Sequence, residues 1–188
     1  FVLFPQSQNK SWFNGPLTTV QGIVNYMIAN NRVDKFRIIA AGLSGGGEAT
    51  WSFISLFPKL VAEATPISAT TAAIATTDYI NTVQDIPIWL SQGGLDVLPK
   101  QGTSDYVVSQ MTNAGMDIRT VQPGEEELGP LSEGFYIVYP TLAHNTWDAF
   151  YNEPFVWQYM LRAYKSNPHV YFGRREFCPG TTLNVKLE

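Results

Sequence analysis

The stretch FRIIAAGLSGGGEATWSF (residues 36–53) decides the fold, because an apolar run enters a glycine turn around Ser44 and leaves it as a helix. Apart from Arg37, the run before the turn is apolar, as expected of a strand in a sheet that is covered on both faces. After the turn, Ala49 and Phe53 lie four residues apart, on one face of a helix. The stretch therefore predicts a strand, a tight turn that carries a serine, and a helix.

The rest of the chain continues this alternation of strand and helix. Further strands are predicted at the apolar runs FVLF (residues 1–4), LVAEATPIS (60–68), IPIWLSQ (86–92) and GFYIVYP (134–140). Patterns with one apolar face predict helices between residues 14 and 31, 106 and 114, and 154 and 163. This alternation predicts an α/β fold, with a mainly parallel sheet and helices on both of its faces.

Composition and charge exclude several classes of protein. The 188 residues are 45% hydrophobic, which suffices for one substantial core. The net charge of −4, without a cluster of basic residues, argues against nucleic-acid binding, and no apolar run approaches the roughly 18 residues of a membrane span. Cys178 is the single cysteine, so the sequence shows no disulfide framework and no metal-site spacing. We expect neither a metal nor an organic cofactor.

The glycine turn carries the first candidate site residue. In open parallel sheets, functional residues gather in the loops at the carboxyl ends of the strands. Residues 42–46 fit the pattern G-x-S-x-G, in which glycines let a serine occupy a strained turn between strand and helix. Ser44 is thus a candidate nucleophile, and the backbone N–H of Gly45 is a candidate donor to an oxyanion. The alternative is a tight glycine turn with a solvated serine.

Two later loops supply partners for this serine. Asp96 follows the strand IPIWLSQ, where its carboxylate can orient an imidazole, although aspartate is also common as a turn residue. His144 follows the strand GFYIVYP, whereas the other histidine, His169, comes after the last helix and is interpreted as a surface residue. The order Ser44, Asp96, His144, each at the end of a major strand, predicts a Ser-His-Asp triad.

Several segments resemble one family once these positions are identified. VDKFRIIAAGLSGGGEATW (33–51) resembles the D-x-x-R-I-x-x-x-G-x-S-x-G-G segment of α/β-hydrolase esterases. IPIWLSQGGLDVLP (86–99) resembles their P-x-W-x-x-H-G-x-x-D-x-x-V-P segment, and HNTWDAFYNEPFVWQYML (144–161) resembles their H-x-x-W-x-x-x-Y ending. The branch is that of feruloyl and acetyl-xylan esterase-like proteins, polyhydroxybutyrate-depolymerase-like proteins and predicted peptidases, and the likeness runs from Val2 to Tyr164.

The resemblance implies a role for each residue of the site. Ser44 would be the nucleophile, Asp96 the acid and His144 the base, with Gly45 as one oxyanion donor. This sequence departs from the family in two places: Gly45 stands where a larger residue such as Met is frequent, and Ser-Gln replaces the histidine that usually precedes the glycines of the acid loop. The resemblance also implies that the early strands of the fold, and the loop with the second oxyanion donor, lie outside this chain or come from a partner.

Tryptophans near these loops are candidates for a substrate pocket, since aromatic side chains line many ligand sites. Trp12 and Trp147 lie in or near loops at the predicted active end, whereas Trp157 is interpreted as helix packing.

The chain is expected to divide into two parts. Residues 1–166 would be the C-terminal portion of an α/β-hydrolase catalytic domain, and the abrupt apolar start suggests a piece of a longer protein. Residues 167–188 would be a terminal segment, in which FCPGTTLNVKLE resembles the opening strand of immunoglobulin-like modules in large secreted bacterial surface proteins. The rival interpretation is a terminal strand of the hydrolase itself. The resemblance implies a secreted or cell-surface bacterial protein with further domains.

Together these patterns predict a serine hydrolase that cleaves carboxylic esters through an acyl-enzyme. The substrate would be a small-molecule or polysaccharide-linked ester. Two alternatives stay open: a serine peptidase of the same fold, because triad chemistry does not separate esters from amides, and a non-catalytic binding or adhesion module on a hydrolase scaffold.

Overall fold

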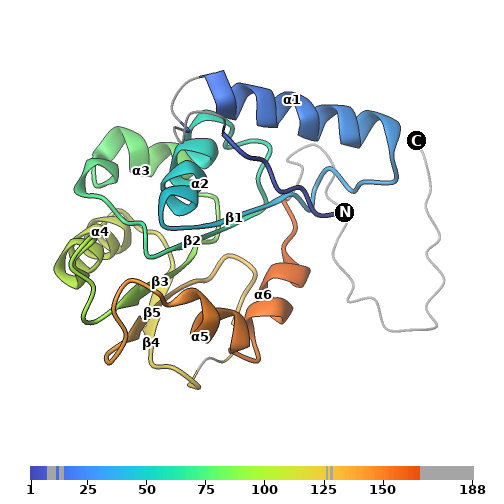
Figure 1. Ribbon diagram of the computed structural model, residues 1–188. Helices are drawn as coiled ribbons and strands as arrows, with labels where there is room; N and C mark the ends of the chain where they lie inside the picture. Colours follow the sequence, from blue (N-terminus) through green and yellow to red (C-terminus); the bar gives the residue numbers. More distant parts are fainter. Residues whose placement is uncertain (8–11, 13–14, 126, 128, 166–188) are drawn as a thin grey trace.

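A five-stranded parallel sheet is the centre of the computed structural model, which describes residues 1–7, 12, 15–125, 127 and 129–165 (Figure 1). Its strands stand in the order β1-β2-β3-β5-β4, and every neighbouring pair is parallel. The strands are β1 (Ile39–Leu43), β2 (Glu63–Ile67), β3 (Trp89–Gly93), β4 (Ile118–Val121) and β5 (Gly134–Tyr139). The helices are α1 (Gly15–Asn30), α2 (Gly45–Leu56), the short 3₁₀ helix η1 (Ala72–Ile74), α3 (Thr77–Val83), α4 (Gln101–Asn113), α5 (Trp147–Asn152) and α6 (Val156–Arg162). The predicted fold class is confirmed.

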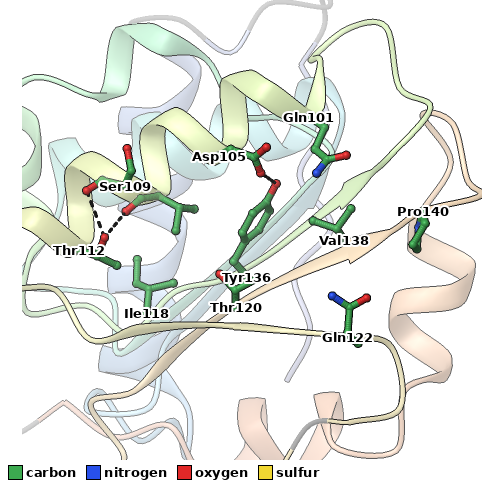
Figure 2. A pocket seen from close by; sticks show the side chains of 11 residues that line it. Gln101, Asp105, Ser109, Thr112, Ile118, Thr120, Gln122, Tyr136, Val138 and Pro140 are labelled. Atoms are coloured by element: carbon green, nitrogen blue, oxygen red, sulfur yellow. Dashed lines mark hydrogen bonds between the residues drawn. The ribbon is translucent and has the colours of Figure 1, made fainter.

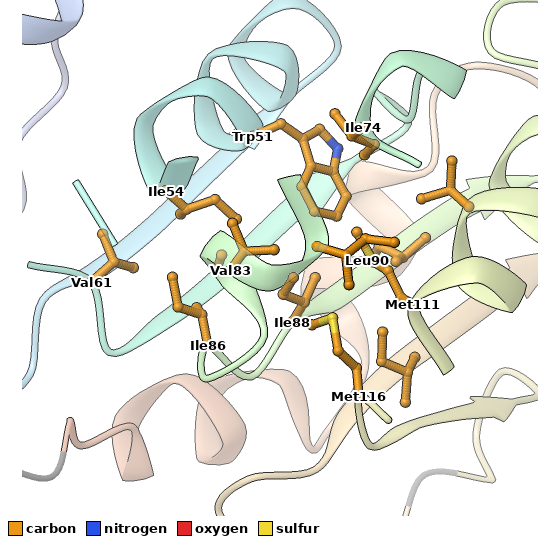
Figure 3. Packing of buried hydrophobic residues seen from close by; sticks show 14 of the residues in the cluster. Trp51, Ile54, Val61, Ile74, Val83, Ile86, Ile88, Leu90, Met111 and Met116 are labelled. Atoms are coloured by element: carbon orange, nitrogen blue, oxygen red, sulfur yellow. The ribbon is translucent and has the colours of Figure 1, made fainter. Parts of the chain in front are cut away.

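Helices α2, α3 and α4 cover one face of the sheet. Their apolar side chains pack on sheet residues that include Ala64, Ile88 and Leu90. Figure 3 shows side chains from α2, α3, β3 and α4 meeting in this cluster. Helix α1 adds the buried Leu17 to the same cluster and contacts α2. Each large apolar side chain that is fully buried here contributes roughly 1.5–3 kcal/mol relative to exposure.

Helices α5 and α6 cover the opposite face, around the buried indole of Trp89 in β3. The ring centroids of Phe135, Phe150 and Tyr159 lie 5.1, 5.3 and 5.1 Å from that of Trp89. The rings of Phe150 and Tyr159 meet it edge to face, an arrangement that aromatic quadrupoles favour. Helices therefore lie on both faces of the sheet, as predicted.

The prediction of a strand at residues 1–4 is wrong. These residues have no regular secondary structure, and Phe1 and Phe4 are 83% and 84% exposed. A strand needs a neighbour to pair with its backbone N–H and carbonyl groups, and no strand in the described part of the chain pairs with this segment. Its apolar composition was therefore not sufficient to make it a strand.

The strand predicted at residues 36–41 begins three residues later than expected, at Ile39. The residues before it are instead bonded to the end of the described chain. The Arg37 guanidinium donates to the carbonyls of Leu161 and Ala163, and the Phe36 carbonyl accepts from the Lys165 N–H at 2.7 Å. These bonds fix the entry to β1, the strand that leads to the glycine turn.

The strand β4 and the helices α3 and α5 were not predicted from the sequence, because all three are short. β4 has four residues, two of which, Arg119 and Thr120, are polar. An edge strand tolerates such residues, and β4 pairs only with β5 in the described sheet. Arg119 forms an ion pair with Glu133, with Nε 2.9 Å from Oε1.

The terminal segment 167–188 lies outside the described residues, together with His169, Cys178 and the resemblance to an immunoglobulin-like strand. The division into two parts thus stays a prediction. In the described part of the chain, every helix is too short or too polar to cross a membrane.

Candidate active site

Ser44 occupies the turn between β1 and α2. Its backbone has φ 50° and ψ −124°, a conformation that residues with a side chain rarely adopt. Its N–H donates to the Ile67 carbonyl at the end of β2 (2.9 Å), and its carbonyl accepts from the Glu48 N–H in α2 (3.0 Å). The strained serine is thus held from both sides, in the geometry of a nucleophile elbow.

Two glycines make this turn possible. A Cβ on Gly42 would lie 2.2 Å from the Gly46 carbonyl oxygen, and a Cβ on Gly47 would lie 2.4 Å from the Cβ of Ala69. By contrast, a Cβ on Gly45 or Gly46 would meet nothing within 4 Å. The steric requirement for glycine therefore falls on Gly42 and Gly47, and the space at Gly45 accommodates a larger residue.

Asp96 lies in the loop after β3, with its side chain only 1% exposed. Its Oδ1 accepts from the Leu98 N–H at 2.9 Å. The buried side chain of Gln92 holds the same loop, because its Nε2 donates to the Pro99 carbonyl (2.9 Å) and its Oε1 accepts from Ser104 Oγ (2.9 Å). The glutamine by which this sequence departs from the family pattern thus anchors the loop of Asp96.

His144 lies in the loop between β5 and α5, which packs directly on the loop of Asp96. Gly93 permits this contact, since a Cβ there would lie 1.9 Å from the Ala143 carbonyl oxygen. His144 Nδ1 lies 2.8 Å from Asp96 Oδ2, and Nε2 lies 2.8 Å from Ser44 Oγ. The structure thus brings together, in one hydrogen-bonded chain, the three side chains that the sequence singled out.

This arrangement can move a proton from the serine hydroxyl to the imidazole. When the Asp96 carboxylate accepts from Nδ1–H, Nε2 carries a lone pair that faces the hydroxyl of Ser44. The imidazole side chain is 39% exposed, so a substrate can reach it, whereas the carboxylate is shielded from solvent. A buried negative charge at Nδ1 favours the imidazolium that forms after proton transfer.

The other predicted site residues are Gly45, Trp147 and Trp12, and they differ in how they relate to the hydrogen-bonded series Ser44–His144–Asp96. Gly45 is the first residue of α2, so its N–H is among the donors that have no partner within the helix. The Trp147 ring meets the His144 ring edge to face, with centroids 5.9 Å apart. Trp12 packs against the hydrophobic cluster under α1 and α2.

Trp157 lies on α6 and stacks on Tyr151 of α5, with ring centroids 5.5 Å apart. Its indole N–H donates to the Tyr151 carbonyl at 3.0 Å. These contacts agree with its interpretation as helix packing.

Sequence reasoning missed three buried hydroxyl side chains beside the site. Ser68, Ser91 and Thr146 are each at most 1% exposed and are joined by hydrogen bonds. Two features of the sequence could have indicated these residues: Ser91 is a polar residue within an apolar strand, and Thr146 follows His144 by two residues.

Glu63, at the start of β2, is a buried carboxyl outside the hydrogen-bonded chain. Its Oε1 accepts from Thr65 Oγ1 at 2.5 Å, and Oε2 has no partner among the described residues. Burial raises the pKa of Glu63 from 4.5 to about 8, against the smaller opposing effect of the Thr65 hydrogen bond. The carboxyl is therefore mainly protonated and neutral at pH 7. Within the described residues, no group of three His, Cys, Asp or Glu side chains is placed to hold a metal ion.

An open cavity of about 500 Å³ lies between α4 and the strands β4 and β5 (Figure 2). In it, Tyr136 points from β5 toward α4 and donates its hydroxyl proton to Asp105 Oδ1 at 2.7 Å. Burial and the neighbouring carboxylate raise the pKa of Tyr136. The residues that line this cavity do not include Ser44, Asp96 or His144, so it is separate from the candidate active site.

Several solved structures are similar to this chain. A thermostable esterase superposes with a TM-score of 0.63 at 22% identity, over 80% of this chain and 37% of the esterase. Arabidopsis thaliana SOBER1 superposes with a TM-score of 0.54 at 19% identity, over 81% of this chain and 73% of SOBER1. An acylaminoacyl peptidase from Pyrococcus horikoshii gives 0.51 at 12% identity, over 73% and 25% of the two chains. No family model matches the sequence, and no curated protein matches it.

The chain has the α/β-hydrolase fold. At these identities the likeness concerns the fold, and the chain spans only part of the length of each of these proteins. The narrower branch of esterases that the sequence resembles stays a prediction.

Proposed function

We propose that residues 1–166 are the C-terminal portion of the catalytic domain of a serine hydrolase that cleaves carboxylic esters. The observation that carries the proposal is the chain from Ser44 Oγ through His144 to Asp96, with 2.8 Å at each step. A serine hydroxyl is a weak nucleophile by itself, and it becomes a strong one when an adjacent base removes its proton during attack. The strained backbone of Ser44 and the esterase among the similar structures support the same reading.

The reaction would proceed through an acyl-enzyme. Ser44 Oγ attacks the carbonyl carbon of the ester while His144 Nε2 takes the hydroxyl proton, and Asp96 stabilises the resulting imidazolium at Nδ1–H. His144 then gives that proton to the leaving alcohol, and the acyl group stays on Ser44. Water, deprotonated by His144, attacks the acyl carbon, so that the carboxylic acid leaves and Ser44 regains its proton.

The Gly45 N–H would stabilise the oxyanion of the tetrahedral intermediate, because it lies at the N-terminus of α2 next to the nucleophile. A second donor is proposed to come from a portion of the protein outside this chain or from a partner. β1 is an edge strand of the described sheet, which leaves the far side of the elbow uncovered by any described strand. Loss of one such donor lowers the rate by about 10²–10³-fold.

Trp147 is proposed to line the substrate pocket, since its ring meets that of His144. Trp12 stays a weaker candidate for this pocket, because it packs against the hydrophobic cluster under α1 and α2. The substrate would be a small-molecule or polysaccharide-linked ester. An amide substrate would need the same three groups, so a peptidase is one outcome of the substrate test. A binding module without activity would need neither the strained serine nor the imidazole bonded to it.

A fluorophosphonate probe tests the proposal on the full-length protein. The wild type is expected to label, and Ser44→Ala is expected not to. The matched control Ser109→Ala removes an exposed hydroxyl from α4 and is expected to label like the wild type. If the wild type labels no more strongly than Ser44→Ala, the protein is not a serine hydrolase that uses Ser44. A panel of p-nitrophenyl esters, feruloyl esters, acetylated polysaccharides and peptides then identifies the class of substrate.

A further inference from the structure

Three buried hydroxyl groups join the ends of β2 and β3 to the loop of His144. Thr146 Oγ1 lies 2.8 Å from Ser68 Oγ and 3.0 Å from Ser91 Oγ. Ser91 is in β3, Ser68 follows β2 directly, and Thr146 precedes α5. Each of the three residues is at most 1% exposed, so water does not compete for these bonds. We call Ser68, Ser91 and Thr146 the hydroxyl cluster.

The hydroxyl cluster lies next to the backbone of both reacting residues, Ser44 and His144, at the end of β2. On one side, the Ile67 carbonyl accepts from the Ser44 N–H at 2.9 Å, and Ser68 is the next residue. On the other side, the Thr146 N–H donates to the His144 carbonyl at 3.1 Å. The positions of Ser44 and of the loop that carries His144 are therefore both fixed relative to the end of β2.

Ser68 carries a second sign of constraint, because its φ of 47° lies in the left-handed region that favours glycine. Its N–H donates to the Ser91 carbonyl at 3.0 Å. Within the described residues, the only non-glycine residues with positive φ are Ser44 and Ser68. Such strain persists where the surrounding structure enforces it, and it gathers at functional sites.

The chemistry of Thr146 explains why hydroxyls stand here in place of apolar side chains. A hydroxyl has one proton to donate and two lone pairs that accept, so Thr146 can donate to one serine and accept from the other. An apolar side chain would fill the same space without fixing the direction of its neighbours. The two bonds set the place of Thr146 relative to two strands, and with it the loop that carries His144.

We propose that Ser68, Ser91 and Thr146 are positioning residues that hold His144 Nε2 at bonding distance from Ser44 Oγ. This inference rests on the proposed serine-hydrolase function and adds three residues to it. A displacement of about 1 Å between reacting groups is enough to lower a rate about 100-fold. The cluster should therefore affect the rate at which Ser44 reacts more than the binding of the substrate.

The test compares Thr146→Val, which keeps the shape and removes both hydrogen bonds, with Thr146→Ser, which keeps the hydroxyl. The measurement on the full-length protein is the modification of Ser44 by a fluorophosphonate, resolved into limiting rate, half-saturating concentration and final amplitude. We expect Thr146→Val to lower the limiting rate about 10–100-fold, with the half-saturating concentration and amplitude unchanged. Thr146→Ser should react within about threefold of the wild-type rate.

A matched control is Thr112→Val on α4, which loses hydrogen bonds to the carbonyls of Val108 and Ser109. Thr112 lines the cavity between α4 and the strands β4 and β5, which is separate from the candidate active site. The variant should label at the wild-type rate whatever it costs in stability. If Thr146→Val lowers only the amplitude, and the labelled fraction reacts at the wild-type rate, the cluster is structural and the inference is overturned.

Two further variants cover a failure of Thr146→Val to fold. Ser68→Ala and Ser91→Ala each remove one of the two bonds, and both should lower the limiting rate; wild-type rates in both would overturn the inference. Failure of the proposed function is distinguishable, because then the wild type itself would label no better than Ser44→Ala. A wild type that labels, beside a Thr146→Val variant that reacts equally fast, would refute only the positioning role.

Discussion

Replacing Glu63 with glutamine is expected to remove a large pH dependence from the stability of the protein. The carboxyl of Glu63 is 1% exposed, and burial raises its pKa from 4.5 to about 8. Between these two pH values the folded state holds a proton that the unfolded state releases. The free energy of unfolding of the wild type therefore falls as the pH rises through this window, and it levels off above about pH 8.

The size of the effect follows from the two pKa values. The unfolding equilibrium constant rises about tenfold for each pH unit inside the window and more slowly near its upper end, which amounts to about 3 kcal/mol by pH 7 and about 4 kcal/mol by pH 8. Glutamine is neutral throughout, so the variant does not share this loss. Tyr151 and Tyr159 also interact with this carboxyl, but burial raises the pKa of both, so they stay protonated across the window.

Urea denaturation from about pH 5 to about pH 8 measures this difference. The unfolding free energy of Glu63→Gln minus that of the wild type should grow steadily with pH. Glu125→Gln, which changes an exposed loop carboxyl in the same way, should follow the wild type at every pH. A difference between Glu63→Gln and the wild type that stays constant with pH would refute the idea that Glu63 is buried as the neutral acid.

Three shorter predictions concern the site. Gly42→Ala places a Cβ 2.2 Å from the Gly46 carbonyl oxygen, so we expect a loss of roughly 1–3 kcal/mol in denaturation experiments, whereas Gly45→Ala enters open space and should stay within about 0.5 kcal/mol of the wild type. Equal stability of the two variants would contradict this assignment of the steric requirement. Asp96→Asn should keep the fold and lower kcat for ester hydrolysis by about 10⁴-fold, because the amide favours the wrong imidazole tautomer; a loss below about tenfold would count against the role of Asp96. Trp147→Ala should raise KM for esters with bulky acyl groups more than for acetyl esters, and Trp147→Phe should restore most of the difference; equal changes for both ester classes would remove Trp147 from the pocket.

Local sequence patterns were sufficient to predict those strands, helices and loops whose structure depends mainly on their own residues. The apolar runs that form β1, β3 and β5 are each followed by a loop with a polar residue. The order of these residues, Ser44, Asp96 and His144, made the triad predictable. Their contact follows from topology, because the carboxyl ends of parallel strands lie at one edge of the sheet.

Properties that depend on distant segments could not be predicted in this way. The run at residues 1–4 has the composition of a strand but no described strand beside it, so composition alone was misleading. The raised pKa of Glu63 arises from burial, which depends on the folded structure and is not revealed by the strand pattern around this residue. The bonds of Thr146 likewise join two strands to a much later loop, and only the folded chain brings those hydroxyls together.

The most direct test of the central claim is to trap the acyl-enzyme. The full-length protein is mixed with p-nitrophenyl acetate, quenched in acid during turnover, digested and analysed by mass spectrometry. We predict one acetyl group on the peptide that contains Ser44, lost in Ser44→Ala together with turnover. Acetyl on another residue, or hydrolysis that continues at the wild-type rate in Ser44→Ala, would contradict the claim that Ser44 is the nucleophile.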